Sequence, residues 1–406
     1  MTGSARPQRW SAIARAHGLQ AGPQGPAFEH AGLAFGGGAF HVFAGLCVVD
    51  RRDHVEFTFR ALRDAGICTT RAGVWKPRTS PYDFQGPGSE CLPWLFELAG
   101  KYGIRMIAIE VLKEGHIDDL QEALEKAGHP TTVMLQIGTR NAQNFELLKA
   151  VGRQHELPVL KKRGMGISLE ESLCAAEYIV AQGNRKVVFC LRGVKTHLGE
   201  PHRNLVDFAL LPVVKRQTWL PVCVDPSHAV GGKERSDDGL SDVHHAAAQG
   251  VIAGADMLLV DVHPEPATAL CDGPQALTLQ ELPFFLDDMQ RVRLVYETRA
   301  RRARAAADPA AALQEVRLGI DDVDAEILAL LSRRAALSRA AAHAKQALGR
   351  PVLDAEREAA TRRWREQLAV ARGLDPGLVD KLFDEIVAWS RRSQEAGAQL
   401  QEAPSA

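Results

Sequence analysis

Short apolar segments rich in β-branched residues recur through the first two thirds of the chain. They occupy residues 41–47, 66–74, 105–111, 131–138, 158–162, 186–192, 221–225 and 256–262. Stretches between them, such as FELLKAVGRQHE and LEESLCAAEYIVAQG, have the apolar spacing of amphipathic helices. Eight strand-then-helix units favour an α/β fold, a closed (β/α)8 TIM barrel, over an open doubly wound sheet.

The composition changes near residue 300, where RRARAAADPAAALQ is rich in Ala and Arg. Beyond it, apolar residues keep a helical period from Leu313 to about Leu348, which predicts a helix of roughly 54 Å. Two further helices are predicted, from Ala355 to Arg372 and from Pro376 into the 390s. The C-terminal part is therefore predicted to be an all-α domain of three helices.

These patterns divide the chain into five parts. The first 38 residues are rich in Gly, Pro and Ala and lack periodicity, so we expect an irregular lead-in there. The predicted parts are this lead-in (1–38), the barrel (39–300), a linker (301–312), the helical domain (313–398) and a disordered tail (399–406).

Charge and cysteine content exclude several classes of protein. The 49 basic and 50 acidic residues give no overall attraction to nucleic acid or to a membrane surface. No signal-like N-terminus and no uninterrupted apolar run long enough to span a bilayer is present, so we expect a cytoplasmic protein. The 7 cysteines are widely spread without a CxxC pair, which fits a reducing compartment.

Basic side chains follow four of the predicted strands. Because the C-terminal ends of barrel strands share one face, these cations are expected to converge there. Single loop cations are usually solvated, but a cluster at one end indicates a site for small polyanions bound by arginine forks. The residues are Arg71, Lys76 and Arg78 with Thr79, then Arg140, Lys162 with Arg163, and Arg192.

A second set of side chains lies at the same predicted face. Cys47 ends the first strand, His228 follows the seventh, Asp261 ends the eighth and Asp272 comes shortly after it. Each has an alternative interpretation as a packing or turn residue. Together, a thiolate, an imidazole and two carboxylates suit a divalent transition metal that acts as a Lewis acid.

The segments KPRTSPYDFQG, QIGTRNAQNFELLK, KRGM, DPSHAVGG and VHPEPATALCDGPQ together resemble the type Iβ 3-deoxy-D-arabino-heptulosonate 7-phosphate (DAHP) synthases. That resemblance covers about residues 39 to 285. It implies a metal-dependent condensation of phosphoenolpyruvate with erythrose 4-phosphate in the shikimate pathway. The metal would be Mn²⁺, Fe²⁺, Co²⁺ or Zn²⁺.

The resemblance also implies roles for the residues that match the family motifs. It implies that phosphoenolpyruvate is bound by Arg140, Lys162 and Arg192, and that the metal ligands are Cys47, His228, Asp261 and Asp272. It implies that the mouth shared by the two substrates, and the site of the aldose phosphate, are formed by Arg71, Lys76, Arg78, Thr79 and Ser80. Of these, Lys76 would lie nearest the reacting atoms.

The sequence departs from the family motifs at a few positions. GLCV stands where the family has GPCS, which places Leu46 and Val48 beside Cys47, and LRG stands for ERG, which places Leu191 before Arg192. Asp261 replaces a metal-binding Glu and is one methylene shorter. These differences leave two alternatives open: a degenerate barrel with a regulatory or structural role, and a barrel that uses another aldose acceptor.

Polar residues on the C-terminal helices form a second pattern. Arg334 and Lys345 are eleven residues apart and fall on one helical face, as do Ser390 and Gln394. Arg317 lies seventeen residues before Arg334, about 25 Å along the axis, so the two cannot share a small pocket within one chain. Arg317 is therefore either a solvated helix charge or a residue that serves a second chain.

This spacing, together with RPVLDAERE, resembles the AroQ chorismate mutases over about residues 312 to 396. The resemblance implies a homodimer that pairs through the long first helix and rearranges chorismate to prephenate without a cofactor. Arg334 and the partner's Arg317 would bind the carboxylates, and Lys345 and Gln394 the ether oxygen. Glu358 and the Asp354 region would hold the hydroxyl, with Arg357 and Ser390 completing the pocket.

The combined hypothesis is a bifunctional enzyme whose two domains act in one pathway. No separate regulatory module precedes residue 39, so we further expect the mutase domain to control the barrel, with prephenate as inhibitor.

Overall fold

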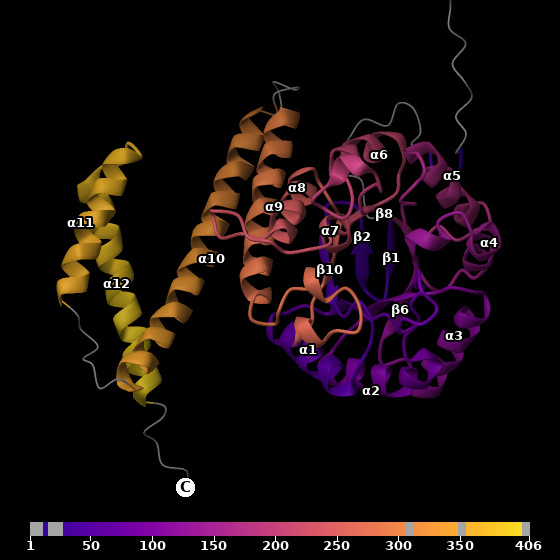
Figure 1. The fold of residues 1–406 in the computed structure, drawn as a ribbon. Helices are drawn as coiled ribbons and strands as arrows, with labels where there is room; N and C mark the ends of the chain where they lie inside the picture. The colour runs from indigo at the N-terminus through magenta and orange to yellow at the C-terminus, as the bar shows by residue number, and fades with distance from the viewer. Residues whose placement is uncertain (1–10, 15–26, 306–311, 348–354, 400–406) are drawn as a thin grey trace, which may run out of the picture. The chain divides into compact units, whose positions relative to one another are not determined.

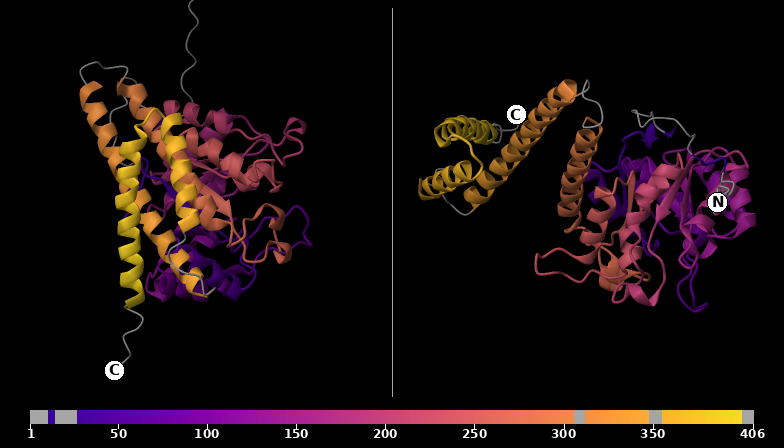
Figure 2. Two further views of the ribbon diagram at one scale, coloured as in Figure 1. Left: turned by 90° about the vertical axis from the view of Figure 1, so that its left-hand side faces the viewer. Right: turned by 90° about the horizontal axis from the view of Figure 1, so that it is seen from above.

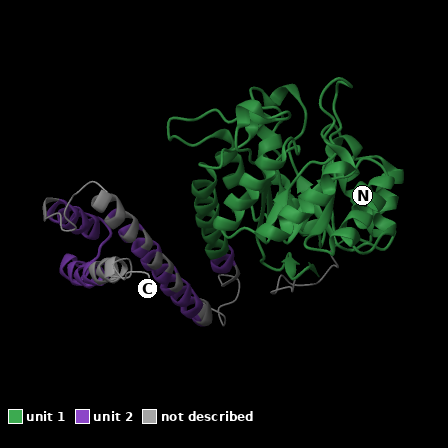
Figure 3. Ribbon diagram, turned by 90° about the horizontal axis from the view of Figure 1, so that it is seen from below, with its two compact units in different colours: residues 1–299 green, residues 300–406 purple. Residues whose placement is uncertain are grey.

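The computed structural model describes residues 11–14, 27–305, 312–347 and 355–399 of the chain. These residues fall into two units, 1–299 and 300–406, which are coloured separately in Figure 3 and are treated one at a time below. The parts that lie outside the described residues are 1–10 and 15–26 of the predicted lead-in, 306–311 of the predicted linker, 348–354, which includes Asp354, and 400–406 of the predicted tail.

Eight parallel strands form the centre of the first unit, and each predicted apolar segment contains one of them. Their order around the sheet is β3-β10-β9-β8-β7-β6-β5-β4, so β3 and β4, at the two ends of this order, meet at a seam. The strands are β3 (His41–Gly45), β4 (Thr69–Arg71), β5 (Met106–Glu110), β6 (Thr132–Ile137), β7 (Val159–Lys162), β8 (Val187–Leu191), β9 (Val222–Val224) and β10 (Met257–Asp261).

Side chains and a short bridge close the seam between β3 and β4. The hydroxyls of Thr69 and Thr70 donate to the carbonyls of Val42 and Ala44 at 2.8 and 2.6 Å. Leu46 and Ala72 form a parallel bridge just beyond the two strands. A side chain at Gly45 would place its Cβ 2.2 Å from the Arg71 carbonyl oxygen, so only glycine permits this approach. The predicted (β/α)8 barrel is confirmed.

Helices surround the strands on the outside of the barrel (Figure 1, Figure 2). Their apolar faces pack on the outward side chains of the sheet, in one continuous core. The helices are α1 (Arg52–Asp64), α2 (Leu92–Tyr102), α3 (Gly115–Ala127), α4 (Phe145–Arg153), α5 (Leu169–Val180), α6 (Leu211–Gln217), α7 (Pro226–Val230), α8 (Asp242–Ile252) and α9 (Leu282–Ala305).

A β-hairpin closes the N-terminal end of the barrel. Its strands are β1 (Phe28–His30) and β2 (Leu33–Phe35), which pair antiparallel. Leu33 and Phe35 join the inward side chains of the barrel strands, such as Met106, in a second apolar core. The lower half of the barrel is therefore filled, and polar side chains lie at the C-terminal end of the strands.

The N-terminal region and the end of the barrel differ from the sequence-based expectation. The predicted irregular lead-in contains the β1–β2 hairpin, and Ala12 and Ile13 donate their amides to the carboxylate of Glu177 on α5. Helix α9 continues to Ala305, into the segment predicted as a linker. The short strands β1 and β2 lie beside glycines, and the end of α9 is rich in Ala and Arg, so neither produces a recognisable pattern of apolar residues in the sequence.

Three helices make up the described part of the second unit beyond Ala305. They are α10 (Ala312–Ala347), α11 (Ala355–Ala371) and α12 (Pro376–Gln399), within one or two residues of the predicted bounds where these were given. Arg362 of α11 pairs with Asp380 and Asp384 of α12 at 2.6 and 3.0 Å. No helix among the described residues of either unit is long and apolar enough to cross a membrane.

Candidate active sites

A cleft of about 380 Å³ opens at the C-terminal ends of the barrel strands. The loops after the strands supply its walls, because parallel strands direct the following residues to the same face. The predicted residues that line it are Lys76, Arg78, Thr79, Arg140, Lys162, Arg192, His228 and Asp272. Arg71, Cys47 and Asp261 are buried beside it, and Ser80 lies on the loop that carries Arg78.

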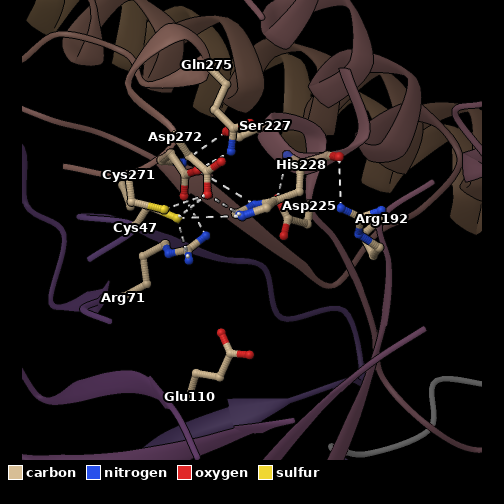
Figure 4. A network of polar contacts seen from close by, with 12 residues as sticks. Cys47, Arg71, Glu110, Arg192, Asp225, Ser227, His228, Cys271, Asp272 and Gln275 are labelled. Carbon is tan, nitrogen blue, oxygen red and sulfur yellow. Dashed lines mark hydrogen bonds and ion pairs between the residues drawn. The ribbon is translucent and has the colours of Figure 1, made fainter. Parts of the chain in front are cut away.

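Three predicted metal ligands meet at the floor of this cleft (Figure 4). The Cys47 Sγ atom lies 3.6 Å from His228 Nε2 and 3.1 Å from an Asp272 carboxylate oxygen. The same Asp272 oxygen lies 3.6 Å from His228 Nε2. A sulfur, a nitrogen and an oxygen this close, from three separate segments of the chain, suit a divalent metal ion.

Charges around these three side chains shift their protonation equilibria. Burial, a hydrogen bond with Cys271 and the charge of Asp261 raise the pKa of Cys47 well above its usual value, against the opposing charge of Lys76. Although burial opposes it, the carboxylates of Asp225 and Asp261 raise the pKa of His228 to about 10. Ligands of a metal ion must lose these protons, so metal binding at this site releases protons.

Asp225 connects the metal-ligand group to the anion-binding group. One of its oxygens lies 3.1 Å from His228 Nδ1, and the other accepts a hydrogen bond from Lys162 Nζ at 2.6 Å. Asp225 is fully buried, and although burial raises its pKa, the charges of His228 and Lys162 lower it well below its usual value. It thus fixes the His228 ring so that Nε2 faces the metal-ligand group.

Asp261 is engaged differently from the other predicted ligands. One carboxylate oxygen pairs with Arg71 Nη1 at 2.5 Å, and the other accepts a hydrogen bond from Gln275 Nε2. Its shortest approach to His228 is 3.6 Å, to Nδ1, the ring nitrogen that Asp225 already holds. Asp261 still belongs to a group of possible metal ligands with Cys47 and His228.

The cleft contains a buried cation whose charge is not fully matched. The Arg192 side chain donates Nη2 to the His228 carbonyl at 3.1 Å, while its buried Nε and Nη1 atoms have no hydrogen-bond partner. Burial lowers the pKa of Arg192, the charge of Asp225 opposing this effect. Lys162 and Arg140 line the same wall. An anionic ligand would supply the missing acceptors.

A further group of possible ligands lies on the outer side of the site. Asp50 accepts from both His54 Nδ1 at 3.1 Å and His263 Nε2 at 2.9 Å. Burial raises the pKa of Asp50, but the hydrogen bonds from His263 and His54 outweigh it and lower the value. Asp50 thus links α1 to the residue that follows β10, while His54 Nε2 is buried without a hydrogen-bond partner, and we interpret the cluster as a support for the loop after β10.

The helical unit brings two of its predicted residues together. Arg334 on α10 donates to the Ser390 hydroxyl and to the Ile386 carbonyl on α12, and Ser390 is buried. Glu358 is half-buried on α11, while Arg317 and Arg357 are exposed. Lys345 and Gln394 lie within α10 and α12, but their side chains, like all of Asp354, fall outside the described part of the structure.

Comparison with known proteins places this geometry in a family. Residues 24–296 match the profile of the DAHP synthetase I family, which is about two thirds of the chain. The chain belongs to the DAHP synthetase I family. Residues 316–395 match the profile of chorismate mutase type II, so the two units correspond to two enzyme families and form a bifunctional shikimate-pathway enzyme.

Individual relatives agree with the family assignment. The phospho-2-dehydro-3-deoxyheptonate aldolase of Thermotoga maritima is 38% identical over 270 residues, which is 66% of this chain and 75% of the relative. Its crystal structure aligns with a TM-score of 0.58 at 37% identity, over 66% of this chain and 74% of the other. A 2-dehydro-3-deoxyphosphooctonate aldolase of Syntrophobacter fumaroxidans is 30% identical over 67% of this chain and 93% of its own length.

The departures from the DAHP synthase motifs fall into two classes. Leu46 and Leu191 are fully buried in the core between strands and helices, so neither side chain lines the cleft. Val48 instead packs with Cys47, Cys271 and Phe84 in a small apolar cluster at the mouth. Leu191, which stands where the family motif has an acidic residue, is thus part of the packing of the barrel and does not change the lining of the cleft.

Sequence reasoning missed four residues of the DAHP synthase site. Lys195 and Arg203 line the cleft, and Arg203 pairs with Asp272 at 3.1 Å. Cys271 directly precedes Asp272 in ALCDGPQ, and Asp225 lies three residues before His228 in DPSHAVGG, so the motifs were the available signal. Arg203 comes from a long loop after β8 that carries no periodic pattern, so its approach to the cleft depends on the fold.

Proposed function

We propose that the barrel condenses phosphoenolpyruvate with erythrose 4-phosphate in the cleft described above, in a metal-dependent reaction. The observation that carries this proposal is the buried Arg192 guanidinium with unpartnered atoms, beside the Cys47–His228–Asp272 group. The first feature provides donors for an anion and the second suits a Lewis-acidic metal, and both reactants are phosphorylated.

The residues of the cleft have separate tasks in this proposal. Arg140, Lys162 and Arg192 bind the phosphate and carboxylate of phosphoenolpyruvate, while Arg78, Thr79 and Ser80 hold the sugar phosphate. Cys47, His228 and Asp272 would hold the divalent metal ion, which polarises the aldehyde carbonyl of the sugar. Arg71 stabilises Asp261 beneath the group.

Lys76 is placed to act at the reacting atoms. Its Nζ atom lies 2.7 Å from Cys47 Sγ and 3.4 Å from an Asp272 carboxylate oxygen. Although burial opposes it, the charges of Cys47, Cys271 and Asp272 raise the pKa of Lys76, so the side chain stays cationic. A fixed positive charge there stabilises negative charge that develops on the aldehyde oxygen.

The identity of the sugar acceptor is the test of this proposal. A heptonate product needs a four-carbon aldose and an octonate product a five-carbon aldose, since phosphoenolpyruvate contributes three carbons. Relatives of both names match the chain, at 38% and 30% identity. We expect metal-supplemented protein to consume phosphoenolpyruvate with erythrose 4-phosphate and much more slowly with arabinose 5-phosphate. No consumption with either sugar would favour a degenerate, regulatory barrel.

We propose that the helical unit rearranges chorismate to prephenate as a homodimer. Arg334, held by Ser390, supplies one carboxylate-binding cation, and Arg317 of a partner subunit supplies the other. Lys345 and Gln394 stabilise charge on the breaking ether bond, with Glu358, Arg357 and the Asp354 region around the hydroxyl. Arg334→Ala should lower kcat/KM for chorismate by roughly 10- to 100-fold, the effect of a lost charge-assisted hydrogen bond.

Exposed apolar side chains along α10 support the proposed dimer. Val316, Ile320, Val323 and Ile327 are each about half exposed and follow a helical spacing of three or four residues. A row of this kind is typical of a helix that pairs with another copy. We place the enzyme in the cytoplasm, because none of its cysteines is paired in a disulfide and both families are biosynthetic.

A further inference from the structure

The Cys47–His228–Asp272 group supplies three donor atoms at the floor of the cleft. Their pairwise separations are 3.1, 3.6 and 3.6 Å. Bonds of about 2.0–2.3 Å to a tetrahedral ion place ligand atoms roughly 3.3–3.8 Å apart, so the three atoms are near the vertices of one coordination sphere. A fourth donor must come from a side chain next to them or from a bound molecule.

Asp261 is poorly placed for this fourth position. One of its oxygens forms an ion pair with Arg71 but no hydrogen bond, and the other accepts a hydrogen bond from Gln275. Its carboxylate approaches the Nδ1 side of the His228 ring, whereas Cys47 and Asp272 approach Nε2. Binding a metal shared with Nε2 would require Asp261 to leave the buried Arg71 guanidinium, and separating a buried ion pair is costly.

Cys271 offers a thiol beside two of these three donor atoms, Cys47 Sγ and the Asp272 oxygen. Its Sγ atom lies 3.1 Å from the Asp272 oxygen that also contacts Cys47 and His228. The Cys47, Cys271 and Asp272 donor atoms all lie within 4.8 Å of one another, and Figure 4 shows the two sulfur atoms side by side.

The backbone explains how two consecutive residues reach the same point. Neighbouring side chains on an extended segment face opposite ways. Asp272 instead has φ of 53°, in the left-handed region, and this turn directs its carboxylate back toward the Cys271 thiol. The strain of a left-handed non-glycine residue is consistent with a functional constraint at Asp272.

We propose that Cys271 is the fourth protein ligand of the metal, and that Asp261 serves to hold Arg71. The aldehyde oxygen of the sugar would then take a fifth position in an expanded coordination sphere. This inference rests on the proposed metal-dependent synthase. Two thiolates, one imidazole and one carboxylate favour a thiophilic ion such as Zn²⁺ or Co²⁺ over Mn²⁺. Lys76 and Arg71 offset the additional negative charge, since Lys76 Nζ lies 2.7 Å from Cys47 Sγ and Arg71 Nη2 lies 3.6 Å from it.

Cobalt spectroscopy on the full-length chain tests this ligand set. Thiolate-to-Co²⁺ charge transfer gives a near-ultraviolet band whose intensity per bound ion scales with the number of coordinating sulfur atoms. With Co²⁺ added under a thiol-free reductant, C271S should give about half the intensity of the unmodified protein. C68S is the matched control, because Cys68 precedes β4 at the opposite end of the barrel, and it should keep the full intensity.

The outcomes separate this inference from the proposed function. A folded C271S, judged by its circular dichroism, that binds Co²⁺ with undiminished intensity would overturn the assignment of Cys271. Phosphoenolpyruvate consumption by unmodified Co²⁺-loaded protein would then still support the synthase. If the unmodified protein shows no thiolate band and no metal-stimulated consumption, both the ligand set and the metal-dependent function are contradicted.

Discussion

Lys161 and Lys162 are neighbours on β7 with opposite surroundings. Lys162 lines the cleft and pairs with Asp225. Lys161 points away from it, is fully buried, and donates Nζ to the Lys162 carbonyl at 2.9 Å. Burial lowers the pKa of Lys161 to about 7 from its usual 10.5. The repeated lysines in VLKKRG therefore contribute one functional charge and one buried amine.

Because the Lys161 amine is buried, we expect Lys161→Leu to increase the stability of the barrel by an amount that depends on pH. Because the folded-state pKa lies below the unfolded value, the unfolded chain binds more protons between about pH 7 and pH 10.5, so this group makes stability rise with pH across that range. Lys161→Leu should raise the free energy of unfolding of the barrel by on the order of 3 kcal/mol at pH 7, and by less toward pH 10.

Denaturant unfolding at several pH values checks the Lys161 prediction. Lys126→Leu, on the exposed surface of α3, is the matched control and should show no such pH-dependent gain. An equal gain for Lys161→Leu at pH 7 and pH 10 would show that the lysine does not titrate in this range.

The β1–β2 hairpin contributes to the protein by packing its side chains into the core of the barrel. Phe35 is almost fully buried, stacks on Phe28 at 4.8 Å between ring centroids, and lies among the inward side chains of the strands. Phe35→Ala should lower the free energy of unfolding of the barrel by about 3–5 kcal/mol, since it leaves a cavity in this core.

Thermal or denaturant unfolding of the full chain measures the effect of Phe35→Ala. Phe57→Ala on α1 is the control, because Phe57 is 45% exposed and its removal opens no internal cavity. A loss for Phe35→Ala as small as that for Phe57→Ala would mean that the hairpin does not close the barrel.

The predictability of elements followed the strength of their periodic signal. The eight barrel strands and the helices α10 to α12 could be predicted because recurring short apolar runs identify the strands and a 3.6-residue period identifies the helices. The hairpin strands have three residues each and lie beside glycines, so no period could emerge. Positions of Lys76, Arg192 and His228 at one face followed from the barrel rule, whereas the pairing of Asp261 with Arg71 depended on side-chain reach that only the structure gives.

At the scale of the whole molecule, the fusion of two enzymes predicts communication between them. A tether alone speeds neither reaction, but a mutase ligand that binds two barrel states with different affinity would control the synthase. We expect prephenate to inhibit phosphoenolpyruvate consumption by the full chain and to leave a chain ending near residue 304 unaffected. If prephenate does not change the synthase rate of the full chain, the helical domain does not regulate the barrel and the fusion only tethers the two enzymes. A truncated chain that is folded but inactive would indicate that the helical domain supports the structure of the barrel.

The two proposed reactions differ in their need for a metal, which allows one preparation to test the central claim. Phosphoenolpyruvate consumption with erythrose 4-phosphate and chorismate consumption are followed before and after a strong chelator is added and removed. We expect the chelator to abolish the first activity, a divalent metal to restore it, and the second to stay unchanged, because only the barrel holds the Cys47–His228–Asp272 group. Loss of both activities together, or synthase turnover that persists without metal, would contradict the account.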